Sequence, residues 1–207
     1  NNNYLRFALQ TGTDGSYLSL GDAVREAKNF TYQTLPDIAN NRKFTLLGDP
    51  AMTLAFPVLN VQPTLINTVP VTQADTLSAG ESVVIEGEVT DPQGNLLTAY
   101  NGYVYPVIYD KPLTVTTRGN DPGSQPASFQ VQQNSLFRGK FSVTGGRFRI
   151  SFKVPRDIGF QYGYGRLSLY AENGNRDGQG LFTNFLVGGL GQGVNTDTTG
   201  PTIRAWL

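Results

Sequence analysis

Hydrophobic and polar residues alternate with a period of two over much of the chain after residue 64. Residues 147–154 show this most clearly, because large apolar side chains at Phe148, Ile150, Phe152 and Val154 alternate with charged or polar ones. Three further runs show the same alternation: residues 83–90, 137–143 and 166–172. Each run predicts a β-strand with one buried face and one face in solvent.

Turn residues separate the predicted strands, at positions 91–94 (DPQG), 145–146 (GG) and 173–175 (NGN). The Gly145-Gly146 pair joins two alternating runs and therefore predicts a β-hairpin. About eight short strands with this spacing are typical of an immunoglobulin-like β-sandwich, which we predict over residues 58–188.

The region before residue 58 has a different pattern. Four apolar residues at i, i+3, i+4 and i+7 predict one stripe of a helix: Leu20, Ala23, Val24 and Ala27. Ser19 is the predicted N-cap, Asp22 suits the first turn, and Pro36 is predicted to end the helix.

Two short strands are predicted after this helix. Phe44–Leu47 is a short apolar run, and residues 48–50 (GDP) break it because Gly and Pro restrict or redirect the backbone. Beyond the break, large and small residues alternate over 51–56. Residues 1–57 therefore read as a short α/β region with too few elements to close a core alone.

The C-terminal segment is rich in Gly and Thr. Residues 188–200 predict a flexible linker, and the apolar residues 201–207 predict the first strand of a further domain. The predicted division is thus 1–57, 58–188 and 189–207.

Composition supports a turn-rich, mainly β protein, since 24 Gly and 12 Pro accompany only 15% charged residues among 207. The formal net charge is zero, so the overall field does not attract nucleic acid. No apolar stretch is long enough for a membrane-spanning helix.

The chain contains no Cys and no His. Thiolate catalysis, disulfides, Ser–His and Cys–His pairs, and metal ligation by these residues are therefore impossible for it alone. We predict no catalytic residue, no metal site and no cofactor. The segment 173–178 (NGNRDG) faintly resembles a calcium loop, but its first position is Asn and Asn184 stands where a bidentate Glu is needed, so a hairpin turn is the preferred interpretation.

Charge is distributed unevenly along the β region. Residues 75–110 hold six acidic and no basic residues, whereas residues 137–166 hold seven basic and one acidic residue. Cross-strand ion pairs would explain this, and Glu86 and Glu88 would then lie on a solvated strand face. The alternative is a docking surface for an anionic glycan or lipopolysaccharide, formed by Arg138, Lys140, Arg147, Arg149 and Lys153.

Tyrosines recur at alternate positions, with Tyr103, Tyr105 and Tyr109 on one predicted strand face and Tyr162 and Tyr164 in a Gly-rich turn. Such a row suits either the edge of a sandwich core, which is the preferred interpretation, or a sugar-binding surface.

Several segments resemble a known family. Residues 20–29 (LGDAVREAKN) and 42–54 (RKFTLLGDPAMTL) resemble the closing segment of the caspase-like domain of gingipain-family cysteine peptidases. Downstream segments resemble the β-domain of the gingipain-like sortases of the type IX secretion system of Bacteroidetes: residues 84–91, 100–102, 109–111, 137–139, 152–158 and 186–189.

The resemblance implies that a parent sortase removes C-terminal sorting domains from secreted cargo at the outer membrane surface and assists their attachment to lipopolysaccharide. It places the catalytic Cys and His before the segments found here, so this chain would be a non-catalytic support or docking piece. The implied partners are the rest of the parent, other secretion-system components, secreted cargo and anionic lipopolysaccharide. A carbohydrate-binding or adhesion β-sandwich is the alternative, since sandwiches host many functions.

Overall fold

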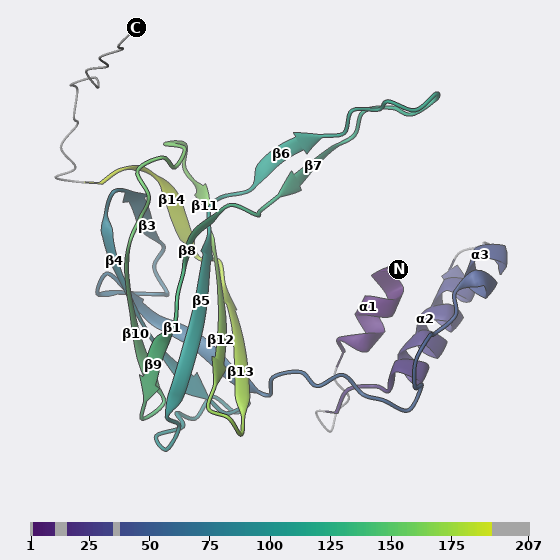
Figure 1. The fold of residues 1–207 in the computed structure, drawn as a ribbon, viewed down its shortest axis with the longest axis horizontal. Helices are drawn as coiled ribbons and strands as arrows, with labels where there is room; N and C mark the ends of the chain where they lie inside the picture. The colour runs from purple at the N-terminus through teal and green to yellow at the C-terminus, as the bar shows by residue number, and fades with distance from the viewer. Residues whose placement is uncertain (1, 11–15, 35–37, 192–207) are drawn as a thin grey trace, which may run out of the picture. The chain divides into compact units, whose positions relative to one another are not determined.

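A computed structural model describes residues 2–10, 16–34 and 38–191. The chain divides into two compact units, residues 1–56 and 57–207 (Figure 1). Pro36 and most of the predicted linker and final strand lie outside the described residues. No helix in the described residues is long and apolar enough to cross a membrane.

The first unit contains three helices, α1 (Asn2–Ala8), α2 (Leu20–Thr34) and α3 (Ile38–Lys43). The rings of Phe7 and Phe30 pack edge to face with centroids 6.0 Å apart, which joins α1 to α2. The predicted N-cap is confirmed, because the Ser19 hydroxyl oxygen accepts a hydrogen bond from the backbone N–H of Asp22 at 3.1 Å. Ala23 and Ala27 of the predicted stripe are buried, so the period of 3.6 identified the packed face correctly.

The prediction of two short strands over residues 44–56 was wrong. In the described structure, residues 44–56 contain no strand, only an isolated bridge between Ser19 and Thr53. The backbone instead follows the start of α2, where Leu20 N–H donates to the carbonyl of Met52 at 2.8 Å. A strand requires a neighbouring strand to pair its backbone, and the described part of this unit offers none to the apolar run at Phe44–Leu47.

The second unit consists of strands. They are β1 (Leu59–Ile66), β2 (Val69–Pro70), β3 (Asp75–Ala79), β4 (Ser82–Thr90), β5 (Gly102–Tyr109), β6 (Leu113–Thr116), β7 (Ser128–Val131), β8 (Ser135–Arg138), β9 (Phe141–Thr144), β10 (Arg147–Lys153), β11 (Gly163–Tyr164), β12 (Arg166–Glu172), β13 (Asp177–Phe182) and β14 (Phe185–Leu190).

Seven of these strands form a closed, barrel-like ring. The hydrogen-bonded order is β12-β13-β1-β4-β10-β9-β5, and β5 pairs with β12 to complete the circuit. The mainly β prediction is confirmed. The immunoglobulin-like sandwich is not confirmed, because a sandwich keeps two separate sheets, whereas pairing from Arg166–Tyr109 to Glu172–Tyr103 joins the ends of this one. A smaller sheet, β11-β14-β3, is not hydrogen-bonded to the ring, but its Leu77 and Phe185 belong to the same buried core.

A glycine permits one close contact between two strands of the ring. All strand pairs of the ring are antiparallel except β1 with β13. Gly180 on β13 is essential to this parallel pair, since a Cβ there would overlap the carbonyl oxygen of Val61. A glycine in a strand interior often marks such an approach of two backbones.

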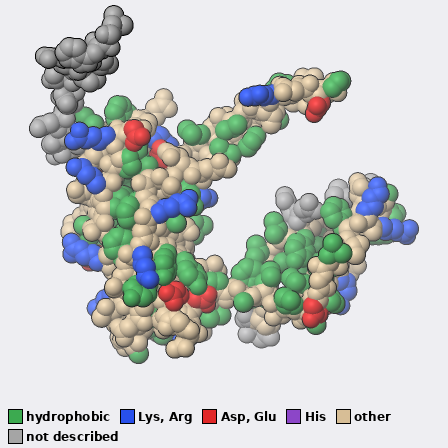
Figure 2. Space-filling view, in the orientation of Figure 1, with side chains coloured by type: hydrophobic (Ala, Val, Ile, Leu, Met, Phe, Trp, Pro, Cys, Tyr) green, Lys and Arg blue, Asp and Glu red, His purple; other side chains and the backbone are tan. Residues whose placement is uncertain are grey.

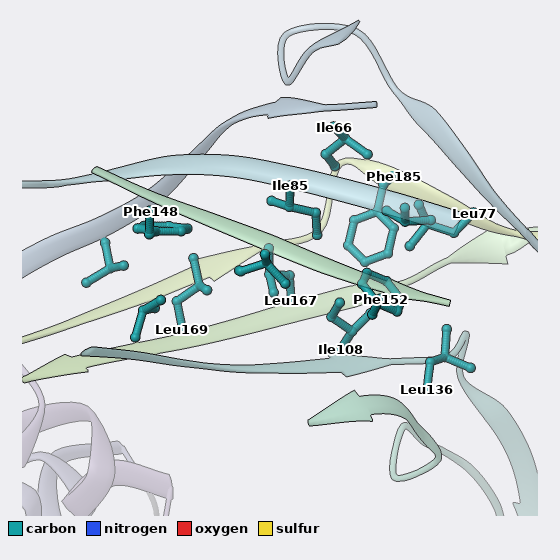
Figure 3. Close-up of a cluster of buried hydrophobic side chains, with 14 of the residues drawn as sticks. Ile66, Leu77, Ile85, Ile108, Leu136, Phe148, Phe152, Leu167, Leu169 and Phe185 are labelled. Atoms are coloured by element: carbon teal, nitrogen blue, oxygen red, sulfur yellow. The ribbon is translucent and has the colours of Figure 1, made fainter. Parts of the chain in front are cut away.

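Apolar side chains from all sides fill the interior (Figure 3). The predicted alternation of β10 is confirmed, since its burial is strictly exposed–buried and Phe148, Ile150 and Phe152 point inward. The alternation over residues 83–90 assigns its last residue to the solvent face, but Thr90 is buried at the end of β4, where it bridges to Leu96 in the following loop. The predicted β9–β10 hairpin is confirmed, and both Gly145 (φ 57) and Gly146 (φ 74) adopt the positive φ of a type I′ turn.

Strands β6 and β7 form a separate two-stranded ribbon, here called the arm, that extends from the barrel (Figure 1). One face of the arm carries four apolar residues in register: Leu113, Val115, Phe129 and Val131. Leu113, Val115 and Phe129 are 56%, 40% and 48% exposed, so this face is open to solvent in the described structure (Figure 2).

Candidate binding surface

The five residues of the predicted basic surface lie on two parts of the barrel. Arg147, Arg149 and Lys153 alternate on the outer face of β10. Arg138 ends β8, and Lys140 follows it in the short connection to β9. Their role in docking an anionic ligand stays a prediction.

The cations on β10 face acidic residues on β4. Arg149 stands opposite Glu86, with its Nη1 3.4 Å from Oε1 of the carboxylate, and Arg147 stands opposite Glu88. Both members of the Arg149–Glu86 pair are well exposed, so the pair contributes no more than about 1 kcal/mol. Part of the uneven distribution of charge along the chain is therefore compensated across β4 and β10 in the folded barrel.

Glu86 and Glu88 do not act as a pair of carboxylates. Glu86 accepts from Arg149, whereas Glu88 Oε1 accepts from the side-chain amide of Gln62 on the opposite neighbour, β1, at 3.2 Å. The described residues contain no group of three or more acidic residues that could hold a metal ion.

The tyrosines of β5 point outward to the surface and do not form the edge of the core, because Val104 and Ile108 take the inward positions. Tyr105 is directly opposite Tyr170 on β12, and their ring centroids are 6.1 Å apart. The preferred interpretation of the tyrosine row was therefore wrong. Inside and outside alternate along a strand, and the shorter branched side chains fill the interior.

Lys140 lies over this aromatic surface. Its Nζ is 3.6 Å from the centroid of the Tyr103 ring and 5.4 Å from that of Tyr105. The pKa of Lys140 is raised, first by its hydrogen bond with Tyr105 and further by nearby negative charge, including that of Glu172. The ammonium group is thus held by the ring faces and the Tyr105 hydroxyl, without an ion pair of its own among the described residues.

Two carboxylates border the rings. The Tyr105 hydroxyl donates to Glu172 Oε1 at 3.1 Å, and the Tyr170 hydroxyl donates to Asp177 Oδ2 at 3.3 Å. The pKa of Tyr170 is raised, first by burial and then by the negative charge of Asp177. We call Tyr103, Tyr105, Tyr170, Glu172 and Asp177 the aromatic seat.

A shallow hollow of about 330 Å³ adjoins the aromatic seat at the β12–β13 turn. Its lining comprises Tyr170, Glu172, Gly174, Asn175, Arg176 and Asp177. The side-chain oxygen of Asn173 is used in hydrogen bonds to the backbone of this turn, since Asn173 Oδ1 accepts from the N–H groups of Asn175 and Arg176 at 3.1 and 2.9 Å. These contacts support the hairpin-turn interpretation over a calcium loop.

A polar network fixes the base of the arm to the barrel. Lys111 Nζ donates to Asp110 Oδ1 at 3.0 Å and to the carbonyl of Gly159 at 2.8 Å, and both side chains are largely buried. Gln132, directly after β7, donates to the carbonyl of Asp110 at 2.7 Å. The arm therefore has an anchored base and an exposed apolar face.

The first unit has a groove of its own. It encloses about 550 Å³ and is lined by apolar and polar residues of α1, α2, α3 and the segment 44–47. Leu47 in that segment is 94% exposed.

Sequence reasoning identified neither the aromatic seat nor the arm. Alternating tyrosines in β5 are visible in the sequence, but Lys140 and Tyr170 come from distant positions that only the closed ring brings together. The arm has an alternating pattern too, which by itself does not distinguish a buried face from an exposed one.

Comparison with known proteins agrees with the motifs of the first unit. Residues 1–55 match the model of peptidase family C25. Over 91% of its length, the chain superposes on the crystal structure of dimeric latent PorU from Porphyromonas gingivalis, with a TM-score of 0.59 and 29% identity. This chain is similar to a segment of PorU. The resemblance to gingipain-type peptidases predicted from the motifs is confirmed.

The match covers nearly all of this chain but only a small part of PorU, since this chain spans 18% of the length of that PorU chain. Two other structures share only 12–13% identity: a conjugative transposon lipoprotein from Bacteroides eggerthii, matched over 61% of this chain and 95% of that one with a TM-score of 0.27, and a PapD-like domain of human CEP192, matched over 72% and 96% with a TM-score of 0.25. Those scores support no argument about fold or function. None of the curated proteins matches the chain.

Proposed function

We propose that this chain is a non-catalytic support and docking region of a PorU-like sortase. Such a parent is a cysteine endopeptidase that removes C-terminal sorting domains from secreted cargo of the type IX secretion system at the outer membrane surface. The likeness to PorU over 91% of the chain supports this proposal. With no Cys and no His, the chain cannot itself supply the nucleophile and base of a cysteine peptidase.

The exposed apolar face of the arm is the observation that supports the docking role. Its apolar face is exposed while its base is anchored, so it can present Leu113, Val115 and Phe129 to another protein without disturbing the barrel. Two-stranded ribbons are marginally stable in water, which favours an arm whose apolar face becomes covered by a partner. We propose a sorting domain of secreted cargo as that partner.

Binding of a purified sorting domain to this chain, measured by calorimetry, tests the docking role. The double variant Val115→Asp/Phe129→Asp places two charges on the apolar face, and we expect binding to fall at least tenfold. The control Thr114→Asp/Gln130→Asp adds the same charges to the opposite face and keeps binding. Equal binding by both variants, or no binding by the unmodified chain, contradicts the docking role.

The non-catalytic role has its own test. The chain, incubated with a cargo protein that carries its sorting domain, should release no cleaved product. Cleavage that survives repeated purification would show that the chain has a reactive group we have not recognised. The surface Arg138, Lys140, Arg147, Arg149 and Lys153 is proposed as a secondary contact with lipopolysaccharide, and its test is given in the Discussion.

A further inference from the structure

The aromatic seat combines three ring faces with two negative charges. Tyr103 and Tyr170 are 43% and 41% exposed, and the hydroxyl groups of Tyr105 and Tyr170 are held by Glu172 and Asp177. Aromatic faces attract cations through the negative potential above the ring, and nearby carboxylates strengthen that attraction. The chemistry of this surface therefore suits a cationic group.

The molecule already places a cation there. Lys140 sits in the short connection between β8 and β9, and its ammonium group lies over Tyr103 and within 5.4 Å of the Tyr105 ring centroid. Lys140 has no carboxylate partner within ion-pair distance among the described residues. Its contact with the rings shows which ligand group the seat accepts.

The contact of Lys140 with the seat is weak enough to exchange. A cation–π contact at an exposed site changes an equilibrium by about two- to fivefold, and a lysine in a connecting loop can rotate away at small cost. A basic side chain from another protein would make the same contacts with Tyr103 and Tyr105 and could reach the Glu172 carboxylate as well. The adjoining hollow leaves room for the polypeptide that bears it.

We infer that the outer face of β5 and β12 is a recognition site for a lysine or arginine side chain of a protein partner, and that Lys140 occupies this site in the free chain. The partner cation displaces Lys140, so Lys140 acts as a built-in competitor that lowers the affinity of the seat for any basic side chain. The inference rests on contacts within the barrel and holds whether or not the arm binds cargo.

The test uses two short peptides, acetyl-Gly-Lys-Gly-amide and acetyl-Gly-Gln-Gly-amide, titrated into the chain while the aromatic NMR signals of tyrosine are followed. Lys140→Gln empties the seat, and we expect this variant to bind the lysine peptide saturably and about two- to fivefold more tightly than the unmodified chain. The glutamine peptide should cause no saturable change. Glucose oligosaccharide, added in a parallel titration, should not perturb the same signals.

Two double variants, each with one further substitution added to Lys140→Gln, test whether the residues of the aromatic seat bind the peptide. Adding Tyr103→Leu removes a ring face but keeps an apolar side chain, and adding Glu172→Gln removes one charge; each should weaken binding of the lysine peptide by about twofold or more. The control Glu86→Gln removes a carboxylate on β4, outside the seat, and should leave binding unchanged. Thermal melts by circular dichroism confirm that each variant is folded.

The inference is wrong if Lys140→Gln shows no saturable binding, if the glutamine peptide binds equally well, or if Glu86→Gln reduces binding as much as Glu172→Gln. Saturable binding of the oligosaccharide instead of the lysine peptide would also overturn it and would assign the tyrosines to a sugar site.

Discussion

Arg149 and Glu86 face each other across strands β10 and β4, and their charged groups approach to 3.4 Å on the outside of the barrel. The pair is exposed, and the side chains next to Arg149 along β10, Phe148 and Ile150, point into the core. Charge and packing are therefore carried by opposite faces of the same strand, and they can be altered separately.

The triple variant Arg147→Gln, Arg149→Gln, Lys153→Gln should leave the melting temperature within a few degrees of the unmodified chain. It removes only outward charges, and surface changes are usually within about 0.5 kcal/mol. If the proposed contact with lipopolysaccharide exists, the variant should bind lipopolysaccharide vesicles more weakly than the unmodified chain. Unchanged vesicle binding would remove these residues from the docking proposal, and a large loss of stability would mean that their charges are needed for folding.

Gly180→Ala should destabilise the barrel severely, by roughly 3 kcal/mol or more, because the new methyl group would overlap the carbonyl oxygen of Val61 across the β1–β13 pair. Gly94→Ala is the control: φ is +87° there and no atom lies within 4 Å of the added Cβ, so it should cost only about 1 kcal/mol of backbone strain. Urea unfolding of both variants measures the difference. Equal losses would contradict the close approach of the two strands.

Tyr100 should contribute stability that disappears at high pH. Burial, and secondly the negative charge of Glu172, raise the pKa of Tyr100 from 10.0 to about 12. Between these values the unfolded chain loses the phenol proton while the folded chain keeps it, so the folded state is increasingly penalised as pH rises from about 10 through 12 and is not penalised below 10.

Comparison with Tyr100→Phe isolates this effect, because Phe has no proton to lose. The stability of the unmodified chain relative to Tyr100→Phe, measured by urea unfolding at several pH values, should be constant below pH 9 and fall above pH 10. Parallel curves across the whole range would show that the pKa of Tyr100 is the same in both states.

Ser19→Ala should reduce the stability of α2 by about 1 kcal/mol, because the N-cap oxygen that accepts from Asp22 N–H is lost. Ser19→Asp supplies an equivalent acceptor and should restore most of the loss. Hydrogen exchange of the amides in the first two turns of α2 measures both effects. Equal exchange rates in all three proteins would show that the cap does not stabilise this helix.

The sequence by itself determined those elements that depend only on residues close together in the chain. The apolar stripe at Ala23 and Ala27, the cap at Ser19, the Gly145-Gly146 turn and the alternation of Phe148, Ile150 and Phe152 all depend on residues near one another in the chain. Their period or backbone preference is readable without a partner, and the structure confirms each one. The motifs of the first unit likewise indicated a relationship to peptidase family C25.

Only the tertiary structure decided how the strands close and which faces meet. Alternation specifies a buried and an exposed face for β5 and β12 but not that they pair, and that pairing turns a predicted sandwich into a ring and brings Tyr105 to Tyr170. For the same reason Phe44–Leu47 was predicted as a strand although no neighbour in the described structure pairs with it. Hydrogen bonds between strands join residues far apart in sequence, so the identity of the neighbour is a property of the whole fold.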